Sequence, residues 1–123
     1  MPHQLEHSAA DRPLDRTEAE ALAESMRAFG AASRVQLLFE LLRGEDAVDA
    51  LASAVEMEPS AVSQQLRVLR QLRLVTAERR GRRVVYRLHD EHVAQLLTAI
   101  RHHHEHTQPA TALRPPEVEA RAR

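Results

Sequence analysis

Residues 59–72 read PSAVSQQLRVLRQL, the pattern of an amphipathic helix. Val62, Leu66 and Leu69 recur at the i, i+4, i+7 spacing that puts apolar side chains on one helical face. Pro59 suits the first helical turn, because the N–H that proline lacks has no partner there. The opposite face is polar and carries Ser60, Ser63, Gln64 and Arg67. We therefore expect a helix that buries one face and offers the other to a partner.

The segments before and after this helix indicate that it is part of a larger motif. Residues 48–55 predict a short helix, and only residues 56–58 separate it from the next, which is a helix-turn-helix pattern. Residues 74–88 read LVTAERRGRRVVYRL, a β-branched and aromatic composition that predicts a hairpin with Gly81 at its turn. A basic hairpin directly after a helix-turn-helix indicates a winged helix, and the combination is more specific than either part.

Three further helices are predicted, from residue 15 or 17 to residue 29, from 33 to 44 and from 90 to 106. The last one has an apolar seam formed by Val93, Leu96, Leu97 and Ile100. A single winged-helix core does not need this additional seam. We therefore expect the seam to pack against the same helix of a second subunit.

The predicted fold is mostly α with a small β-hairpin, a dimeric winged helix-turn-helix in the order α-α-α-α-β-β-α. A length of 123 residues suits one domain. We place that domain at residues 15–106, after a mobile N-terminal arm at residues 1–14 and before a disordered tail at residues 107–123.

The charges are segregated along the chain. Residues 59–89 carry eight arginines and one acid, whereas residues 1–58 carry twelve acids and five arginines, so the net charge of −1 hides a basic block. All 17 basic residues are arginine. Such a block is typical of a phosphate-binding surface, although a solvated arginine face has the same composition.

Several protein classes are excluded or disfavoured by what the sequence lacks. The absence of cysteine excludes disulfides, thiolate nucleophiles and thiolate metal sites. No apolar run approaches the roughly 18 residues that span a bilayer, and the first residues do not have the composition of a signal peptide. No nucleophile–base pair or phosphate loop suggests an enzyme. We expect a non-enzymatic protein of the cytoplasm, without a membrane partner.

The winged-helix pattern makes double-stranded DNA the expected partner. The second helix of a helix-turn-helix enters the major groove, where glutamine pairs with adenine and arginine with guanine. The residues expected to contact DNA are Ser60, Ser63, Gln64 and Arg67 on the helix and Arg80, Arg82 and Arg83 on the wing. RNA or single strands are less favoured, because the chain has only three aromatic residues on which bases could stack.

Residues 57–70, MEPSAVSQQLRVLR, followed by Leu74-Val75 and by residues 81–88, GRRVVYRL, resemble the ArsR/SmtB family of bacterial repressors. The resemblance extends over residues 17–106. It implies a winged-helix homodimer whose first and last helices form the interface. It also implies that helix 60–70 reads operator DNA, and that an effector, often a metal ion, releases the protein from the operator.

Histidines are concentrated in the last predicted helix. His103 and His106 are three residues apart, so they are neighbours on one helical face, and His92 lies 11 residues earlier on the same face. His92 is about 16 Å from His103 along the axis, too far to share an ion. Two antiparallel helices can join Asp90 and His92 of one subunit to His103 and His106 of the other, which creates two equivalent sites.

This set of one carboxylate and three imidazoles matches the last-helix site of the family's zinc, cobalt and nickel sensors. The family's thiolate site is missing, which excludes arsenic, lead and cadmium sensing through cysteine. Four ligands suit Zn(II), whereas Ni(II) and Co(II) favour additional nitrogen or oxygen donors. The arm and residues 89–97 are similar to the NmtR-type nickel and cobalt sensors, although no histidine follows His106. The possible additional ligands are Pro2 (through its amine), His3, His7 and His102.

The resulting hypothesis is a metal-responsive repressor that binds operator DNA as a homodimer and is released by Ni(II) or Co(II). Three alternatives stay open: a Zn(II) sensor of the same fold, a DNA-binding repressor with a non-metal effector, and a metal-handling protein that does not bind an operator. The histidine run 102–106 also has an ordinary interpretation as a polar helix end, because the helix dipole favours imidazoles at a C-terminus, but this leaves Asp90 and His92 unexplained.

Overall fold

The computed structural model describes residues 12–107 of the chain. It contains helices α2 (Arg16–Met26), η1 (Arg27–Gly30, a 3₁₀ turn), α3 (Ala32–Arg43), α4 (Val48–Val55), α5 (Pro59–Gln71) and α6 (Glu91–Thr107), and strands β1 (Asp46–Ala47), β2 (Val75–Arg80) and β3 (Arg83–Leu88). The expected mostly helical fold with a hairpin is confirmed. Within residues 12–107, no helix is both long and apolar enough to cross a membrane.

Helix α5 is held by its apolar stripe. Val62, Leu66 and Leu69 are fully buried, as their spacing predicts, and they join a core formed by α3, α4, β2 and α6. Glu56 ends α4 in the left-handed conformation, with φ 58°, which lets the chain turn sharply into α5. The helix-turn-helix therefore presents one face of α5 to the core and leaves the other outside.

The wing is the antiparallel hairpin β2–β3, in register from Val75 opposite Leu88 to Arg80 opposite Arg83. Gly81 makes the turn with φ 66°, a conformation that costs glycine little. Strand β1 adds a third strand that the sequence did not predict, on the free edge of β3. Two residues carry no periodicity, so β1 exists only because β3 lies beside it.

Two expectations for the helices need correction. The first helix does not continue to Phe29, because α2 ends at Met26 and the chain tightens into η1. The seam of α6 does not face a partner as a whole, since Val93 and Leu97 are buried in this protomer's own core, whereas Leu96 and Ile100 are exposed. The physical reason is that α6 returns across α3 directly after the wing.

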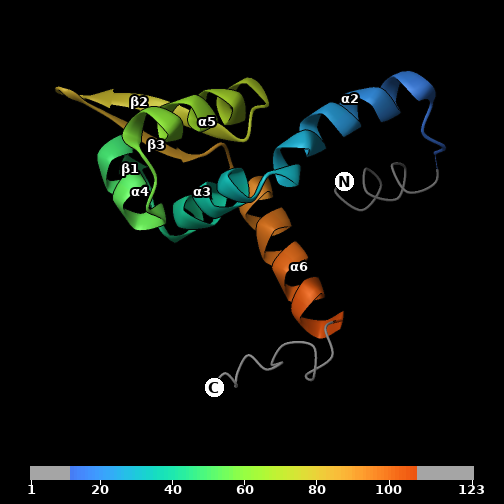
Figure 1. The fold of residues 1–123 in the computed structure, drawn as a ribbon. Helices are drawn as coiled ribbons and strands as arrows, with labels where there is room; N and C mark the ends of the chain where they lie inside the picture. Colours follow the sequence, from blue (N-terminus) through green and yellow to red (C-terminus); the bar gives the residue numbers. More distant parts are fainter. Residues whose placement is uncertain (1–11, 108–123) are drawn as a thin grey trace, which may run out of the picture.

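Two helices project from the body that contains α3, α4, α5 and the wing (Figure 1). Helix α2 has no buried residue. The large exposed apolar side chains include Leu22 and Met26 on α2 and Leu96 and Ile100 on α6. Exposed apolar side chains gathered on projecting helices are typical of an interface.

We expect Leu66→Ala to destabilise the protein by about 2–5 kcal/mol, because it leaves a cavity under α5. Urea unfolding at fixed protein concentration measures the change. Gln64→Ala, on the exposed face of the same helix, is the control and is expected to change stability by less than about 0.5 kcal/mol. Equal effects of the two variants would contradict the assignment of the faces.

Candidate DNA-binding surface and metal-ligating residues

The exposed face of α5 carries the residues expected to read bases. Ser60, Ser63, Gln64 and Arg67 are all exposed. They lie opposite the buried stripe and toward the beginning of the helix, where the free N–H groups and the helix dipole favour an anion. The arrangement gives α5 hydrogen-bonding side chains and the guanidinium of Arg67 on a single open face.

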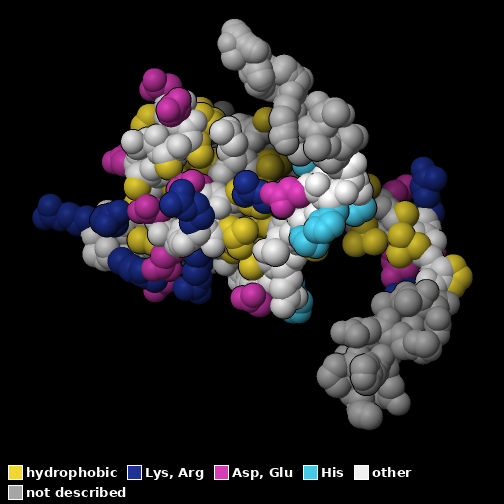
Figure 2. All heavy atoms as spheres, turned by 90° about the horizontal axis from the view of Figure 1, so that it is seen from below, with side chains coloured by type: hydrophobic (Ala, Val, Ile, Leu, Met, Phe, Trp, Pro, Cys, Tyr) yellow, Lys and Arg dark blue, Asp and Glu magenta, His cyan; other side chains and the backbone are white. Residues whose placement is uncertain are grey.

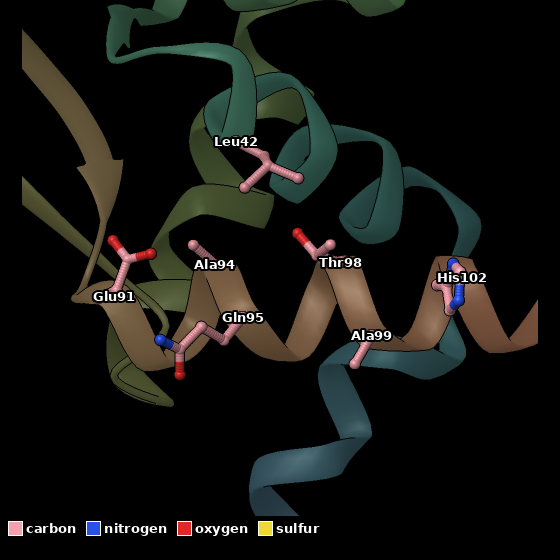
Figure 3. Close-up of a pocket in the computed structure, with 7 residues that line it drawn as sticks. All are labelled: Leu42, Glu91, Ala94, Gln95, Thr98, Ala99 and His102. Atoms are coloured by element: carbon pink, nitrogen blue, oxygen red, sulfur yellow. The ribbon is translucent and has the colours of Figure 1, made fainter.

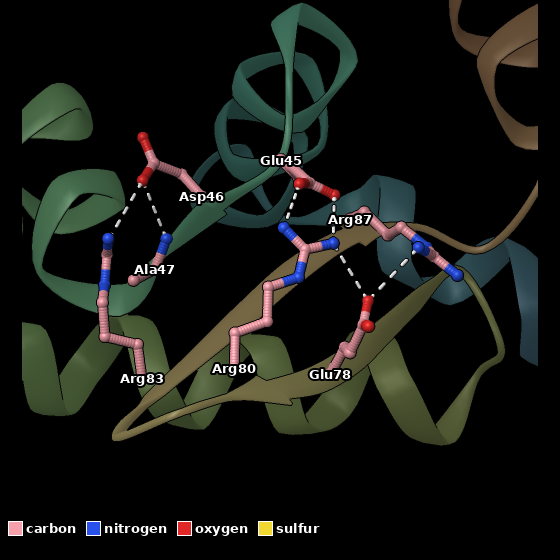
Figure 4. Close-up of polar contacts among 7 residues, drawn as sticks. All are labelled: Glu45, Asp46, Ala47, Glu78, Arg80, Arg83 and Arg87. Atoms are coloured by element: carbon pink, nitrogen blue, oxygen red, sulfur yellow. Dashed lines mark hydrogen bonds and ion pairs between the residues drawn. The ribbon is translucent and has the colours of Figure 1, made fainter.

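The wing arginines differ in their surroundings, which the sequence did not reveal. Arg80 forms a paired contact with both carboxylate oxygens of Glu45 and a 3.0 Å hydrogen bond from Nη2 to Oε1 of Glu78 (Figure 4). The hydrogen bond from Arg80 lowers the pKa of Glu45, and the two carboxylates raise the pKa of Arg80. Arg80 is thus held between the wing and the segment before β1.

A second pair of contacts repeats this pattern. Nη2 of Arg83 lies 3.8 Å from Oδ1 of Asp46, and the same oxygen accepts a 2.9 Å hydrogen bond from the N–H of Ala47. Arg87 lies 3.5 Å from Glu78 on the opposite strand (Figure 4). Acidic residues from before and within β1 therefore neutralise two of the three wing arginines expected to contact DNA.

Arg82 and its neighbour Arg79 are different. Both are exposed, and neither forms an ion pair with a carboxylate of the described part of the chain. Arg79 has only a long contact, 3.5 Å, from Nη1 to the carbonyl of Gly81. Arg79 was not among the residues expected to contact DNA, although its place in the arginine run beside Gly81 was a signal for it. The unneutralised positive charge of the wing is at Arg79 and Arg82.

Asp90 and His92 lie together at the beginning of α6. Asp90 Oδ1 accepts a 3.2 Å hydrogen bond from the N–H of Val93 and lies 3.6 Å from Nδ1 of His92. A hydrogen bond of 3.2 Å from His89 is the main cause that lowers the pKa of Asp90, and the Val93 N–H adds to it. The carboxylate is therefore ionised at neutral pH, and the side chain of His92 is 90% exposed.

The other histidines are at the far end of α6, where all side chains are exposed. The rings of His102 and His106 lie 4.2 Å apart, centroid to centroid. Nδ1 of His106 lies 3.2 Å from the carbonyl oxygen of His102. A carbonyl only accepts, so Nδ1 is the donor, and Nε2 is the nitrogen that carries the lone pair in the neutral ring. Figure 2 shows histidines gathered over α6, away from the arginines and carboxylates of the wing side.

Within one protomer the two ends of α6 are separated. No group of three or more His, Asp or Glu side chains among residues 12–107 is close enough to hold a metal ion. The structure thus pairs Asp90 with His92 and leaves His103 about three turns and His106 about four turns away along the helix. Pro2, His3 and His7 lie outside the described residues.

Two surface hollows flank α6. A cavity of about 260 Å³ is lined by Met26, Phe29, Leu96 and Ile100. A shallow groove of about 510 Å³ runs along another side of α6 (Figure 3). In the groove, Leu42 of α3 points toward Ala94 and Thr98, and His102 lies at one end. His102 therefore borders the groove as well as the ring of His106.

Comparisons with known proteins agree with this geometry. The family model described as "Bacterial regulatory protein, arsR family" matches residues 32–77. The HTH-type transcriptional regulator NmtR of Mycobacterium tuberculosis is 46% identical over 107 residues, which are 86% of this chain and 89% of that protein.

Solved structures give the same result. The solution structure of apo-NmtR matches with a TM-score of 0.67 and 44% identity, over 82% of this chain and 91% of that one. A homodimeric winged helix-turn-helix DNA-binding domain from Mycobacterium bovis matches with a TM-score of 0.72 and 32% identity, over 80% of this chain and 93% of that one. The winged helix, the exposed face of α5 and these similarities lead to one conclusion: the chain belongs to the ArsR family of bacterial transcriptional regulators.

Proposed function

We propose that the chain is a homodimeric repressor of the bacterial cytoplasm that binds operator DNA through α5 and the wing and is released by Ni(II) or Co(II). The ion would be held by Asp90 and His92 of one protomer and by His103 and His106 of its partner. The observation that carries the proposal is the division of these four donors between the two ends of one exposed helix face.

The exposed apolar residues of α6 support the antiparallel arrangement. Leu96 and Ile100 lie between His92 and His103 on the same side of the helix, Leu96 four residues after His92 and Ile100 three residues before His103. Packing these two residues on their copies in a second, antiparallel α6 brings His92 of each protomer toward His103 of the other. The same contact covers the cavity that Leu96 and Ile100 share with Met26 and Phe29.

The donor chemistry fits a divalent first-row metal. Asp90 is ionised, His92 is almost fully exposed, and the contact of His106 through Nδ1 leaves Nε2 as the nitrogen of the neutral ring that would bind a metal. The hydrogen bond between His106 and the His102 carbonyl also fixes the orientation of the ring, as carbonyl and carboxylate partners do for metal-binding histidines. His102 itself is one of the possible additional ligands, together with Pro2, His3 and His7 of the arm.

Nickel or cobalt is favoured over zinc by two features. The arm contains nitrogen donors in addition to the carboxylate and three imidazoles at residues 90–106. Both ions favour five or six ligands. The similarity to NmtR extends over most of the chain and so supports the resemblance to NmtR-type sensors. Zn(II) in a closed tetrahedron of the four α6 residues is the second candidate.

Linkage between the two sites accounts for release. Each recognition helix of a dimer must reach a successive turn of the major groove, so its position relative to the dimer axis sets the affinity for DNA. Residues Asp90, His92, His103 and His106 fix the crossing of the two α6 helices when an ion joins them. If that crossing holds the two α5 helices at a spacing that does not match successive turns of the major groove, the affinity for DNA falls. Couplings between sites commonly change affinity by about 5- to 150-fold.

Arg82 is expected to contribute phosphate contacts, and Arg80 is expected to hold the wing in place. We predict that Arg82→Ala reduces the salt dependence of DNA binding, because each lost phosphate contact lowers the slope of log K against log salt by about one. Arg80→Ala is the matched variant and should change the slope less, since its charge is already paired with Glu45 and Glu78. Fluorescence anisotropy over a range of salt concentrations tests this. Equal slopes for Arg82→Ala and the unmodified protein would contradict it.

The metal site predicts a selective loss of response. His103→Ala is expected to abolish release of DNA by Ni(II), Co(II) or Zn(II), while metal-free DNA binding persists. His104→Ala is the matched control, because residue 104 is a neighbour that lies about 120° from His92 around the helix. Release that survives in His103→Ala would refute the site, and a protein that no metal releases would favour a non-metal effector.

Absorption of the Co(II)-bound protein distinguishes the two metal candidates. We expect weak visible bands, typical of six-coordinate Co(II), whereas intense bands would indicate a four-coordinate, zinc-like site. Deletion of residues 2–7 is expected to intensify the bands, because the arm then supplies no ligands. A spectrum that the deletion leaves unchanged would show that α6 alone provides the donors.

A further inference from the structure

Arg34, at the beginning of α3, contacts two different parts of the fold. Its Nε donates to the carbonyl of Ala28 at 3.2 Å, and its Nη2 donates to the carbonyl of Arg27 at 3.2 Å. Its Nη1 donates to Oε1 of Gln65 on α5 at 3.1 Å. One guanidinium thus joins the 3₁₀ turn η1 to the recognition helix.

The two carbonyls accept hydrogen bonds from this one side chain. They belong to η1, where α2 ends, and the last carbonyls of a helix lack N–H donors from a following turn. Ala28 is fully buried and Arg34 is half-buried, so water replaces the hydrogen bond to the Ala28 carbonyl poorly, whereas the one to Arg27 is exposed. The fork of the guanidinium reaches both carbonyls and Gln65 at once, which a single ammonium group cannot do.

Gln65 differs from its neighbours on α5. Ser63 and Gln64 are exposed, whereas Gln65 is half-buried and directs its amide oxygen to Arg34. It is therefore held by the protein itself and is not free to read a base. Its hydrogen bond acts on the turn of α5 that carries Ser63 and Gln64, two of the side chains expected to contact DNA.

The other end of the connection reaches the exposed face of α6. Phe29 of η1 and Met26 of α2 line one cavity with Leu96 and Ile100, and Figure 1 places the junction of α2 and α3 beside α6. A change in how Leu96 and Ile100 pack on a second copy would therefore reach Met26 and Phe29, next to the η1 carbonyls that Arg34 binds. Arg34 adds a polar contact between η1 and α5 to the apolar packing of α6 on α3 and of α3 on α5.

We propose that Arg34 is a positioning residue, which sets the orientation of the recognition helix relative to the dimerisation surface formed by α2, η1 and α6. This role of Arg34 rests on the proposed function, because it presupposes a dimer that binds two half-sites. Because Arg34 binds Gln65, a displacement of η1 is transmitted to α5. The spacing between the two recognition helices therefore responds to the packing of α6. Loss of the contact leaves each α5 able to bind but less strictly spaced.

The test measures two ratios of DNA affinities for Arg34→Lys, Gln65→Met and the double variant. The first is the loss of affinity when one base pair is inserted at the centre of a duplex that the unmodified protein selects from random sequences. The second is the loss of affinity when Ni(II) is added. We expect both ratios to fall by about fivefold or more in each single variant, a magnitude within ordinary couplings between sites. The double variant should fall no further, because the two residues form one contact.

Arg43→Lys is the matched control. It makes the same change on the same helix, and within residues 12–107 the ion pair that Arg43 forms is with Glu40 of α3, at 3.8 Å. A purely structural role of Arg34 would weaken binding to all duplexes alike and leave both ratios unchanged. Gln65→Met keeps the capping of the two carbonyls, so it decides the question even if Arg34→Lys does not fold.

The proposal is overturned if both single variants keep the ratios of the unmodified protein, or if the double variant shows the product of two independent effects. If Ni(II) does not release the unmodified protein, the proposed metal response fails, and the insertion ratio alone decides the role of Arg34. If no duplex is selected at all, the proposed DNA binding and the role of Arg34 fall together.

Discussion

Burial of Val62, Leu66 and Leu69 under α5 is the interaction on which the remaining structure depends. Three fully buried aliphatic side chains attach the recognition helix to the core of α3, α4 and α6. Their spacing also dictates which side chains stay outside, because the helix has only one face left. The wing follows α5 directly and packs on the same core through Val75, so its position is derived from that of the helix.

The arginines of the wing divide into those that form ion pairs with carboxylates and those whose charge is not paired. Glu45 and Asp46 come from the segment that forms β1, and they meet Arg80 and Arg83 across the edge of the sheet. Exposed ion pairs of this kind contribute little to stability, but they remove positive charge from the surface. Arg79 and Arg82 keep theirs, so the net charge of the basic segment overstates the charge that DNA would meet.

Helix α6 serves two surfaces because its apolar residues divide between them. Val93 and Leu97 secure the helix to its own protomer, while Leu96 and Ile100 remain exposed between the two groups of side chains that we propose as metal ligands. Only a rigidly held helix can carry donors at fixed separation to a second copy. In the proposed dimer, the same face that closes the metal sites also presses on η1, and Arg34 connects η1 to α5.

The sequence by itself determined what depends on short-range periodicity: the winged-helix order of elements, the buried stripe of α5, the polar face opposite, and the donor set on α6 without any thiolate. Tertiary structure alone decided the contacts between distant segments. Arg80 meets Glu45 across 35 residues, Arg34 meets Gln65 across 31, and β1 forms only on the edge of β3. The seam of α6 illustrates the physical reason. Periodicity shows that Val93, Leu96, Leu97 and Ile100 share a side, but which of them this protomer buries depends on where the rest of the chain packs.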